Sequence, residues 1–130
     1  MYKRQVHGFA FELDRRIRAA GSPRLSLVAH PGFSLTGLSE RRPGINDLTR
    51  SRRLRDGALS FVAQGKHQGA WSTVRAALDP EAESGRFFGP DHTLTGAPIV
   101  VAPVLSSASP EFGATFWAFA EERTGVRFLV

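Results

Sequence analysis

Residues 24–38, Arg-Leu-Ser-Leu-Val-Ala-His-Pro-Gly-Phe-Ser-Leu-Thr-Gly-Leu, contain an apolar run that stops abruptly at a proline and a glycine. Pro31 cannot donate a hydrogen bond to a sheet, and Gly32 tolerates backbone angles that other residues avoid. The pair therefore predicts the end of a strand over 24–29. Because open α/β sheets bind their ligands at the carboxyl ends of their strands, the residues from Phe33 onward are the first candidates for a binding site.

Helical patterns lie on both sides of this strand. Phe9, Leu13 and Ile17 recur at steps of four residues, which predicts a helix over 6–20 with one apolar stripe. Because a strand follows this helix within a few residues, the two form half of a βαβ unit. Periodicity and capping signals predict the remaining elements, which are helices over 47–62, 68–78 and 110–124 and short strands over 86–88 and 99–101.

The composition is that of one ordinary globular domain. The chain has 130 residues, of which 42% are hydrophobic and 22% charged, so disorder is not expected. It contains no cysteine, which excludes disulfides, thiolate zinc sites and cysteine nucleophiles. No apolar stretch is long enough for a membrane span and no signal peptide is visible, so a cytoplasmic location is expected.

The net charge of +5 raises a second interpretation. A small basic protein could bind nucleic acid or an anionic surface through its arginine-rich segment, 41–55. Against this, the segment matches no recognised nucleic-acid motif, and its arginines are not interleaved with aromatic residues. A solvated helix face is the favoured interpretation of these arginines, which are Arg41, Arg42, Arg50, Arg52, Arg53 and Arg55.

Five segments of the chain occur in a recognisable order. They are FAFELDRR at 9–16, HPGFSLT at 30–36, the pair GA at 69–70 with RAA at 75–77, GRFFGP at 85–90, and ERTGVRF at 122–128. Their order and spacing resemble the C-terminal half of the short-chain dehydrogenase/reductase family, in the branch with retinol dehydrogenase-like and protochlorophyllide reductase-like members. The resemblance covers nearly everything from Phe9 onward.

This resemblance implies an α/β fold class: the C-terminal portion of a Rossmann-type doubly wound parallel sheet, with few strands and about four helices. The strands at 24–29 and 86–88 would lie parallel, and the free edge of the first would face strands that the chain lacks. An edge of that kind is an aggregation risk, so marginal stability is expected.

The implied activity is that of an NAD(P)-dependent oxidoreductase, which interconverts an alcohol and a carbonyl by hydride transfer with NAD or NADP as cofactor. The implied substrate is a small-molecule alcohol or carbonyl compound. The family's glycine-rich cofactor turn does not occur, however, and its Tyr-x-x-x-Lys pair is absent, because Tyr2 is the one tyrosine and Val6 stands where the lysine would follow. No catalytic residue is therefore predicted, and the isolated chain is expected to be inactive.

The first five residues are predicted to be foreign to the protein. Lys3 falls where the family's lysine would be, but Tyr2 to Gln5 are what the end of a transposase sequencing adapter, TAT-AAG-AGA-CAG, encodes. We expect residues 1–5 to come from adapter translated with a metagenomic read. Residues 6–130 would then be the C-terminal part of one Rossmann-fold domain.

The predicted cofactor-binding residues follow the strand at 24–29. Pro31, Gly32 and Thr36 match the family's segment beside the nicotinamide, where backbone groups and a hydroxyl meet the carboxamide or a phosphate oxygen. Ser34 offers a second hydroxyl with weaker support. The alternative for the isolated chain is a strand-terminating turn with a surface threonine.

The segment 33–65 corresponds to the family's substrate-binding loop and lid. Phe33, Leu35 and Leu38 could line an apolar pocket over the nicotinamide, or they could equally be packing residues. Metal binding is not predicted: His30 has no second ligand at metal-ligand spacing and is interpreted as a hydrogen-bonded structural histidine. The sequence leaves the substrate, the choice of NAD or NADP, and the oligomeric state open.

Overall fold

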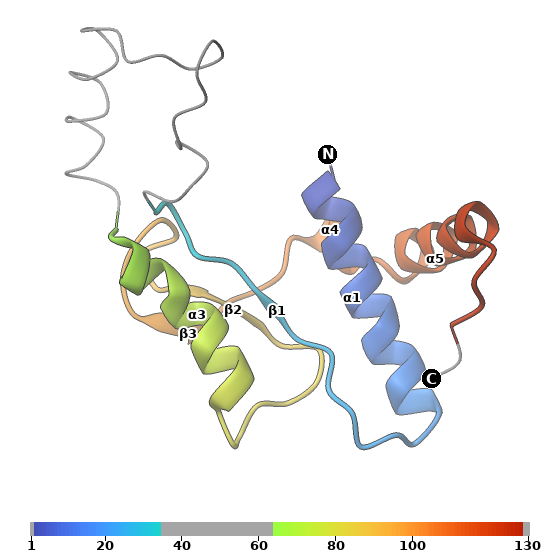
Figure 1. The fold of residues 1–130 in the computed structure, drawn as a ribbon, viewed down its shortest axis with the longest axis horizontal. Helices are drawn as coiled ribbons and strands as arrows, with labels where there is room; N and C mark the ends of the chain where they lie inside the picture. Colours follow the sequence, from blue (N-terminus) through green and yellow to red (C-terminus); the bar gives the residue numbers. More distant parts are fainter. Residues whose placement is uncertain (1, 35–63, 129–130) are drawn as a thin grey trace, which may run out of the picture. The chain divides into compact units, whose positions relative to one another are not determined.

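The computed structural model describes residues 2–34 and 64–128 (Figure 1). Within these ranges the chain has an α/β fold with a three-stranded mixed sheet in the order β1-β2-β3. The elements in chain order are α1 (Tyr2–Ala19), β1 (Val28–Ala29), α3 (Lys66–Leu78), β2 (Phe87–Pro90), β3 (Pro98–Val100), α4 (Leu105–Ala108) and α5 (Pro110–Thr124).

The first two strands run parallel, as predicted. The backbone N–H of Val28 donates to the carbonyl of Arg86, and that of His30 donates to the carbonyl of Phe88, both at 3.0 Å. The next donor in this ladder would be Pro90, which has no N–H. The parallel pairing therefore ends there, and within the described part of the chain β1 is an edge strand, as expected.

The third strand corrects the expectation of an entirely parallel sheet. The N–H of Asp91 donates to the carbonyl of Ala97 at 3.0 Å, and that of Val101 donates to Phe87 at 2.8 Å, so β2 and β3 form an antiparallel hairpin. Only a short turn over 91–97 joins the two strands. Parallel neighbours need a crossover of a dozen or more residues, so a turn of this length forces the antiparallel arrangement.

The strand predicted over 24–29 is shorter in the structure, where β1 holds only Val28 and Ala29. The residues before it bond to side chains and turns. Ser26 receives Gly85 N–H on its carbonyl at 2.8 Å, donates its own N–H to Ser84 Oγ at 2.9 Å, and donates its hydroxyl to the carbonyl of Ala10 at 2.8 Å. These bonds replace the regular ladder.

The chain divides into two compact units. One comprises Met1–Val28, Asp79–Phe87 and Val100–Val130, and the other comprises Ala29–Leu78 and Phe88–Ile99. In the first unit α1 contacts α4 and α5. Its buried cluster consists of Phe11, Val28 and Phe87.

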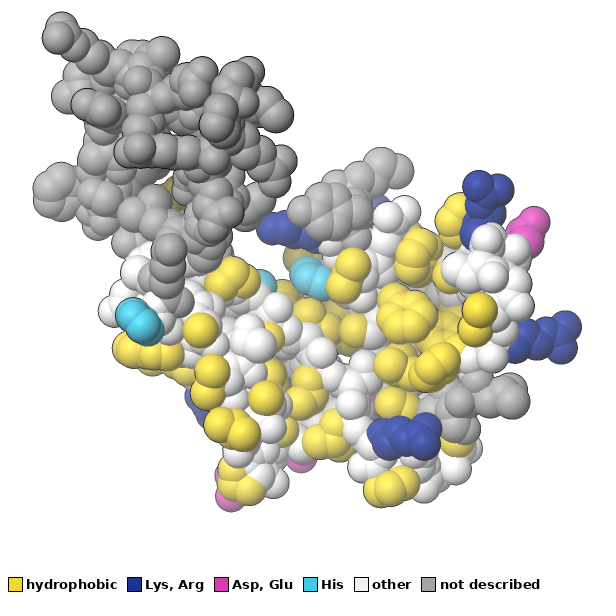
Figure 2. All heavy atoms as spheres, viewed as in Figure 1, with side chains coloured by type: hydrophobic (Ala, Val, Ile, Leu, Met, Phe, Trp, Pro, Cys, Tyr) yellow, Lys and Arg dark blue, Asp and Glu magenta, His cyan; other side chains and the backbone are white. Residues whose placement is uncertain are grey.

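The burial of α1 differs from the single stripe that its periodicity predicts. Ile17 is buried as expected and Phe9 and Leu13 are half-buried, but Phe11 and Glu12, which lie off this stripe, are buried as well. Gly8 lets α5 approach closely, since a Cβ there would lie 2.5 Å from the Phe112 ring. The helix therefore packs on two sides. Figure 2 shows hydrophobic side chains gathered over the region of α1 and α5.

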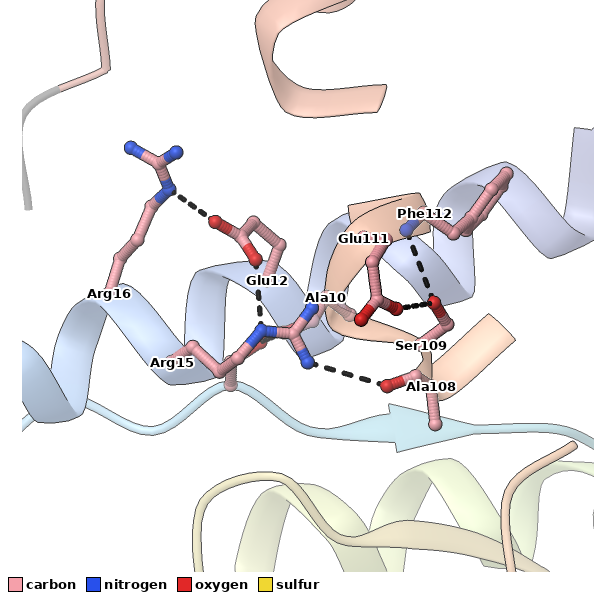
Figure 3. A network of polar contacts seen from close by, with 9 residues as sticks. Ala10, Glu12, Arg15, Arg16, Ala108, Ser109, Glu111 and Phe112 are labelled. Carbon is pink, nitrogen blue, oxygen red and sulfur yellow. Dashed lines mark hydrogen bonds and ion pairs between the residues drawn. The ribbon is translucent and has the colours of Figure 1, made fainter. Parts of the chain in front are cut away.

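Carboxylates on α1 pair with arginines of the same helix (Figure 3). Glu12 accepts hydrogen bonds from Arg15 Nε and Arg16 Nε, both at 2.9 Å, and Arg15 Nη1 reaches the carbonyl of Ala108 at 3.4 Å. Asp14 pairs with Arg18 at 2.9 Å. The two carboxylates therefore serve different arginines.

The start of α1 differs from the predicted boundary at residue 6. The helix begins at Tyr2, and the guanidinium of Arg4 donates to the carbonyl of Ser106 at 3.2 and 3.3 Å. It also lies 4.6 Å from the centroid of the Phe112 ring. The foreign origin of residues 1–5 remains a prediction.

A pH-dependent contribution to stability is expected from His7. Its ring lies 5.1 Å from that of Phe87, and burial, followed by the positive charge of Lys3, lowers the pKa of His7 below its ordinary value of 6.5. The unfolded chain thus binds this proton more readily, so the free energy of unfolding should fall as the pH falls below 6.5 through the folded-state pKa of His7. Urea unfolding on both sides of this range should show the slope reduced in His7→Gln. A slope in His7→Gln equal to that of the wild type would contradict the assignment.

Candidate functional site

The candidate site is the turn that follows β1, residues 30–34, which belongs to the second unit. Gly32 has a φ of +66°, a left-handed conformation that favours glycine. Its N–H donates to Nδ1 of His30 at 3.1 Å. His30 is therefore hydrogen-bonded, as predicted.

The turn lies directly against the hairpin turn that joins β2 and β3. The N–H of Phe33 donates to the carbonyl of Leu94 at 2.6 Å. A Cβ added to Gly32 would lie 2.3 Å from that carbonyl oxygen and 2.8 Å from Pro90 Cγ. Gly32 is therefore required by the close approach of two backbones as well as by its φ.

Glycines on neighbouring elements make room for two side chains of the turn. A Cβ on Gly89 in β2 would lie 2.4 Å from His30 Nε2. A Cβ on Gly69 in α3 would lie 2.8 Å from Ser34 Oγ. These contacts hold the turn between α3 and the carboxyl end of β2.

The structure brings together four of the predicted site residues, Pro31, Gly32, Phe33 and Ser34. Pro31 and Phe33 are exposed, and Gly32 and Ser34 are half-buried. Thr36, Leu35 and Leu38 lie outside the described residues. So do most of the predicted lid at 33–65, the helix at 47–62 and the arginine-rich segment 41–55.

Sequence reasoning did not identify Gln64, which is 6% exposed and touches the turn. Its N–H donates to the carbonyl of Phe33 at 3.0 Å, and its side chain bonds to Pro31 and Gly96. Gln64 stands outside the periodic apolar positions of α3. No local pattern marks it as a contact of the turn.

The hydrogen bonds of the turn define which groups hold its shape. The amides of Gly32 and Phe33 and the carbonyl of Pro31 are engaged by His30, Leu94 and Gln64. These groups fix the backbone. Ser34, which is half-buried, therefore lies in a turn whose backbone conformation is fixed by hydrogen bonds to His30, Leu94 and Gln64.

The described ranges offer neither a metal site nor a membrane-spanning helix. Residues 2–34 and 64–128 contain no group of three histidine or acidic side chains that could hold a metal ion. Among the helices of the same ranges, none combines the length and the apolar character that crossing a bilayer demands.

The chain is similar to a solved structure of unassigned function. A crystal structure of an uncharacterized protein from Mycobacterium paratuberculosis matches it with a TM-score of 0.71 and 28% sequence identity. The match covers 100% of this chain and 39% of that chain, so the chain spans well under half of the neighbour's length. No protein-family model matches the chain, and no curated protein matches it significantly.

Proposed function

We propose that this chain carries the nicotinamide end of an NAD(P)-dependent short-chain oxidoreductase that interconverts an alcohol and a carbonyl by hydride transfer. In this proposal the chain is the C-terminal part of a Rossmann-type domain. It is inactive by itself, because it has neither the glycine-rich cofactor turn nor the Tyr-x-x-x-Lys pair.

The observation that carries the proposal is the place of the Pro31-Gly32 turn. It follows β1 directly, and β1 has β2 as a parallel neighbour. Ligands of open α/β sheets bind beyond the carboxyl ends of parallel strands. The proposal that the ligand is a nicotinamide cofactor rests on the five segments that resemble the short-chain dehydrogenase/reductase family.

The free side of β1 is compatible with a larger mixed sheet in which further strands follow it. Within the described residues, β1 has a neighbour on one side only, so the other side can accept a further strand. The similar Mycobacterium protein is longer than this chain, which covers 39% of it. Both observations agree with a fold that is completed by additional polypeptide.

In this proposal only some polar groups of the turn are free to contact a nicotinamide group. The bound cofactor would supply the hydride-transfer chemistry. The amides of Gly32 and Phe33 already donate within the protein, so they shape the turn. The proposed contacts to the carboxamide or to phosphate oxygen therefore fall to the hydroxyls of Ser34 and Thr36, while Phe33, Leu35 and Leu38 would face the substrate.

Titration of the isotope-labelled chain with nicotinamide mononucleotide tests the proposal. We expect this ligand to shift the amide resonances of Gly32, Phe33 and Ser34, because the turn is proposed to meet the nicotinamide half of the cofactor. Adenosine monophosphate, the other half, is the matched control and should leave these resonances in place. The proposal is wrong if neither ligand moves them, or if both move them equally.

A further inference from the structure

Gln64 is a buried polar residue between two turns of the second unit. One residue, Gly65, separates it from the start of α3. Gln64 is 6% exposed, whereas Gln68 in α3 is exposed. A side chain that is withdrawn from water needs hydrogen-bond partners for its amide. The partners of Gln64 come from segments far apart in the chain.

Both ends of the Gln64 amide are used. Nε2 donates to the carbonyl of Pro31, and Oε1 accepts from the N–H of Gly96 at 3.2 Å. The orientation of the amide is determined by chemistry, because a carbonyl can only accept and a backbone N–H can only donate. Gln64 thus bridges the 30–34 turn and the hairpin turn at 91–97.

The same residue is also tied to the turn through its backbone. Its N–H donates to the carbonyl of Phe33 at 3.0 Å, and Gln64 forms a parallel bridge with Ser34. Four consecutive residues of the turn region, 31–34, therefore contact either Gln64 or the hairpin turn that Gln64 holds.

We propose that Gln64 is a positioning residue, which holds the backbone of residues 31–34 in the shape that receives the nicotinamide group. This inference rests on the proposed function for the identity of the ligand. The bridge itself rests only on the contacts of Gln64. Ser34 would touch the ligand, and Gln64 would act through the turn.

The chemistry of the bridge requires one donor and one acceptor on the same side chain. Ionised glutamate is isosteric with glutamine but can only accept, so Gln64→Glu keeps the bond from Gly96 and loses the bond to Pro31. Methionine has a similar length and can make neither bond well. Gln64→Glu therefore removes one of the two side-chain hydrogen bonds, and Gln64→Met removes both.

Hydrogen exchange of single amides tests the bridge without any ligand. We expect Gln64→Met to speed exchange at Gly96 by about tenfold, because that amide loses its acceptor, and Gln64→Glu to leave it near the wild-type rate. Exchange at Phe33 should speed up in both variants, because both release Pro31. The matched control is Gln68→Glu, the same chemical change at an exposed position, which should alter neither amide.

Amides of α5 report whether a variant is folded, since they belong to the other unit. If they stay protected while Phe33 exchanges at the wild-type rate in both Gln64 variants, the bridge does not hold the turn and the inference is overturned. Loss of protection throughout would call for Gln64→Asn, which keeps both functional groups on a shorter arm. That variant should show the same acceleration at Phe33, and wild-type exchange there would overturn the inference.

Titration with nicotinamide mononucleotide then tests the link to binding. We expect Gln64→Glu to raise the apparent Kd by about tenfold relative to wild type and to Gln68→Glu. Equal Kd values in all three proteins would overturn the positioning role. If the wild-type chain binds no nicotinamide mononucleotide while Phe33 exchange still depends on Gln64, the proposed function fails and the bridge alone is supported.

Discussion

Replacing Gly32 with alanine is expected to lower the free energy of unfolding by about 2–5 kcal/mol. One part of this loss, about 1–2 kcal/mol, comes from placing a side chain at a φ of +66°. The rest comes from the new Cβ, which would lie 2.3 Å from the carbonyl oxygen of Leu94. A backbone oxygen cannot rotate away as a flexible side chain can. Urea unfolding followed by circular dichroism measures the loss.

Gly21 provides a matched control for this experiment. It has a φ of +63°, close to that of Gly32, but a Cβ there would meet nothing within 4 Å. Gly21→Ala should therefore show only the backbone cost, about 1–2 kcal/mol. Equal losses at the two positions would mean that the turn and the hairpin can separate without cost, and that their close approach does not define the site.

The end of β1 could be predicted from sequence because its signals are local. Pro31 lacks a donor and Gly32 tolerates a positive φ, and both properties act within the turn itself. The contact with Leu94 could not be predicted in this way, because the hairpin turn lies far along the chain. Sequence patterns report local geometry, whereas this close approach depends on how β2 and β3 fold back.

The bounds of α5 could be predicted because capping residues at both ends of the helix set them. Ser109 caps it, because its Oγ accepts from the N–H of Phe112 at 3.2 Å. The same hydroxyl donates to Glu111 at 2.6 Å and lowers the pKa of that carboxyl. Pro110 begins the helix and Gly125 ends it with a φ of 68°, as predicted. The short α4 before it has no side-chain cap, so the sequence contains no capping residue from which this helix could be predicted.

The strands were predicted less accurately than the helices. Hydrophobic runs placed β1, β2 and β3 close to their positions, but pairing decides how much of each run is strand. Ser26 bonds to a turn and not to a regular ladder, which shortens β1. The second strand was predicted to end at residue 88, yet Gly89 and Pro90 are the last residues of β2, because the hairpin with β3 continues through Asp91. Partners that are distant in sequence set these boundaries.

The candidate site was predicted in part for the same reason. Pro31, Gly32, Phe33 and Ser34 are adjacent in sequence and form one turn in the structure. Gln64 comes from a separate segment, and a lone glutamine next to a glycine resembles ordinary surface sequence. Only the fold shows that its amide meets two backbone groups. Residues that position a turn from a distance are therefore the ones that sequence reasoning misses.

Replacing Trp117 with alanine is expected to cost about 3–5 kcal/mol, a large part of the stability of a small domain. Trp117 is 1% exposed and stacks on Phe9 with ring centroids 4.8 Å apart. The guanidinium of Arg16 lies 4.3 Å from its ring centroid, and Phe128 meets it edge-on at 5.9 Å. The variant removes a large buried ring together with its contacts to α1 and to the segment after α5.

Two further variants separate the ring from its hydrogen bond. Trp117 Nε1 donates to Glu121 Oε1 at 3.0 Å, and the same oxygen accepts from the N–H of Phe128 at 3.3 Å. Trp117→Phe keeps an aromatic ring but loses this donor, so it should cost less, about 1–3 kcal/mol. Trp71, the other tryptophan, is 44% exposed, and Trp71→Ala should cost under about 1 kcal/mol. Fluorescence of the Trp71→Ala protein then reports Trp117 alone during urea unfolding. A cost for Trp117→Ala no larger than that for Trp71→Ala would contradict this prediction and show that other contacts hold α1 and α5 together.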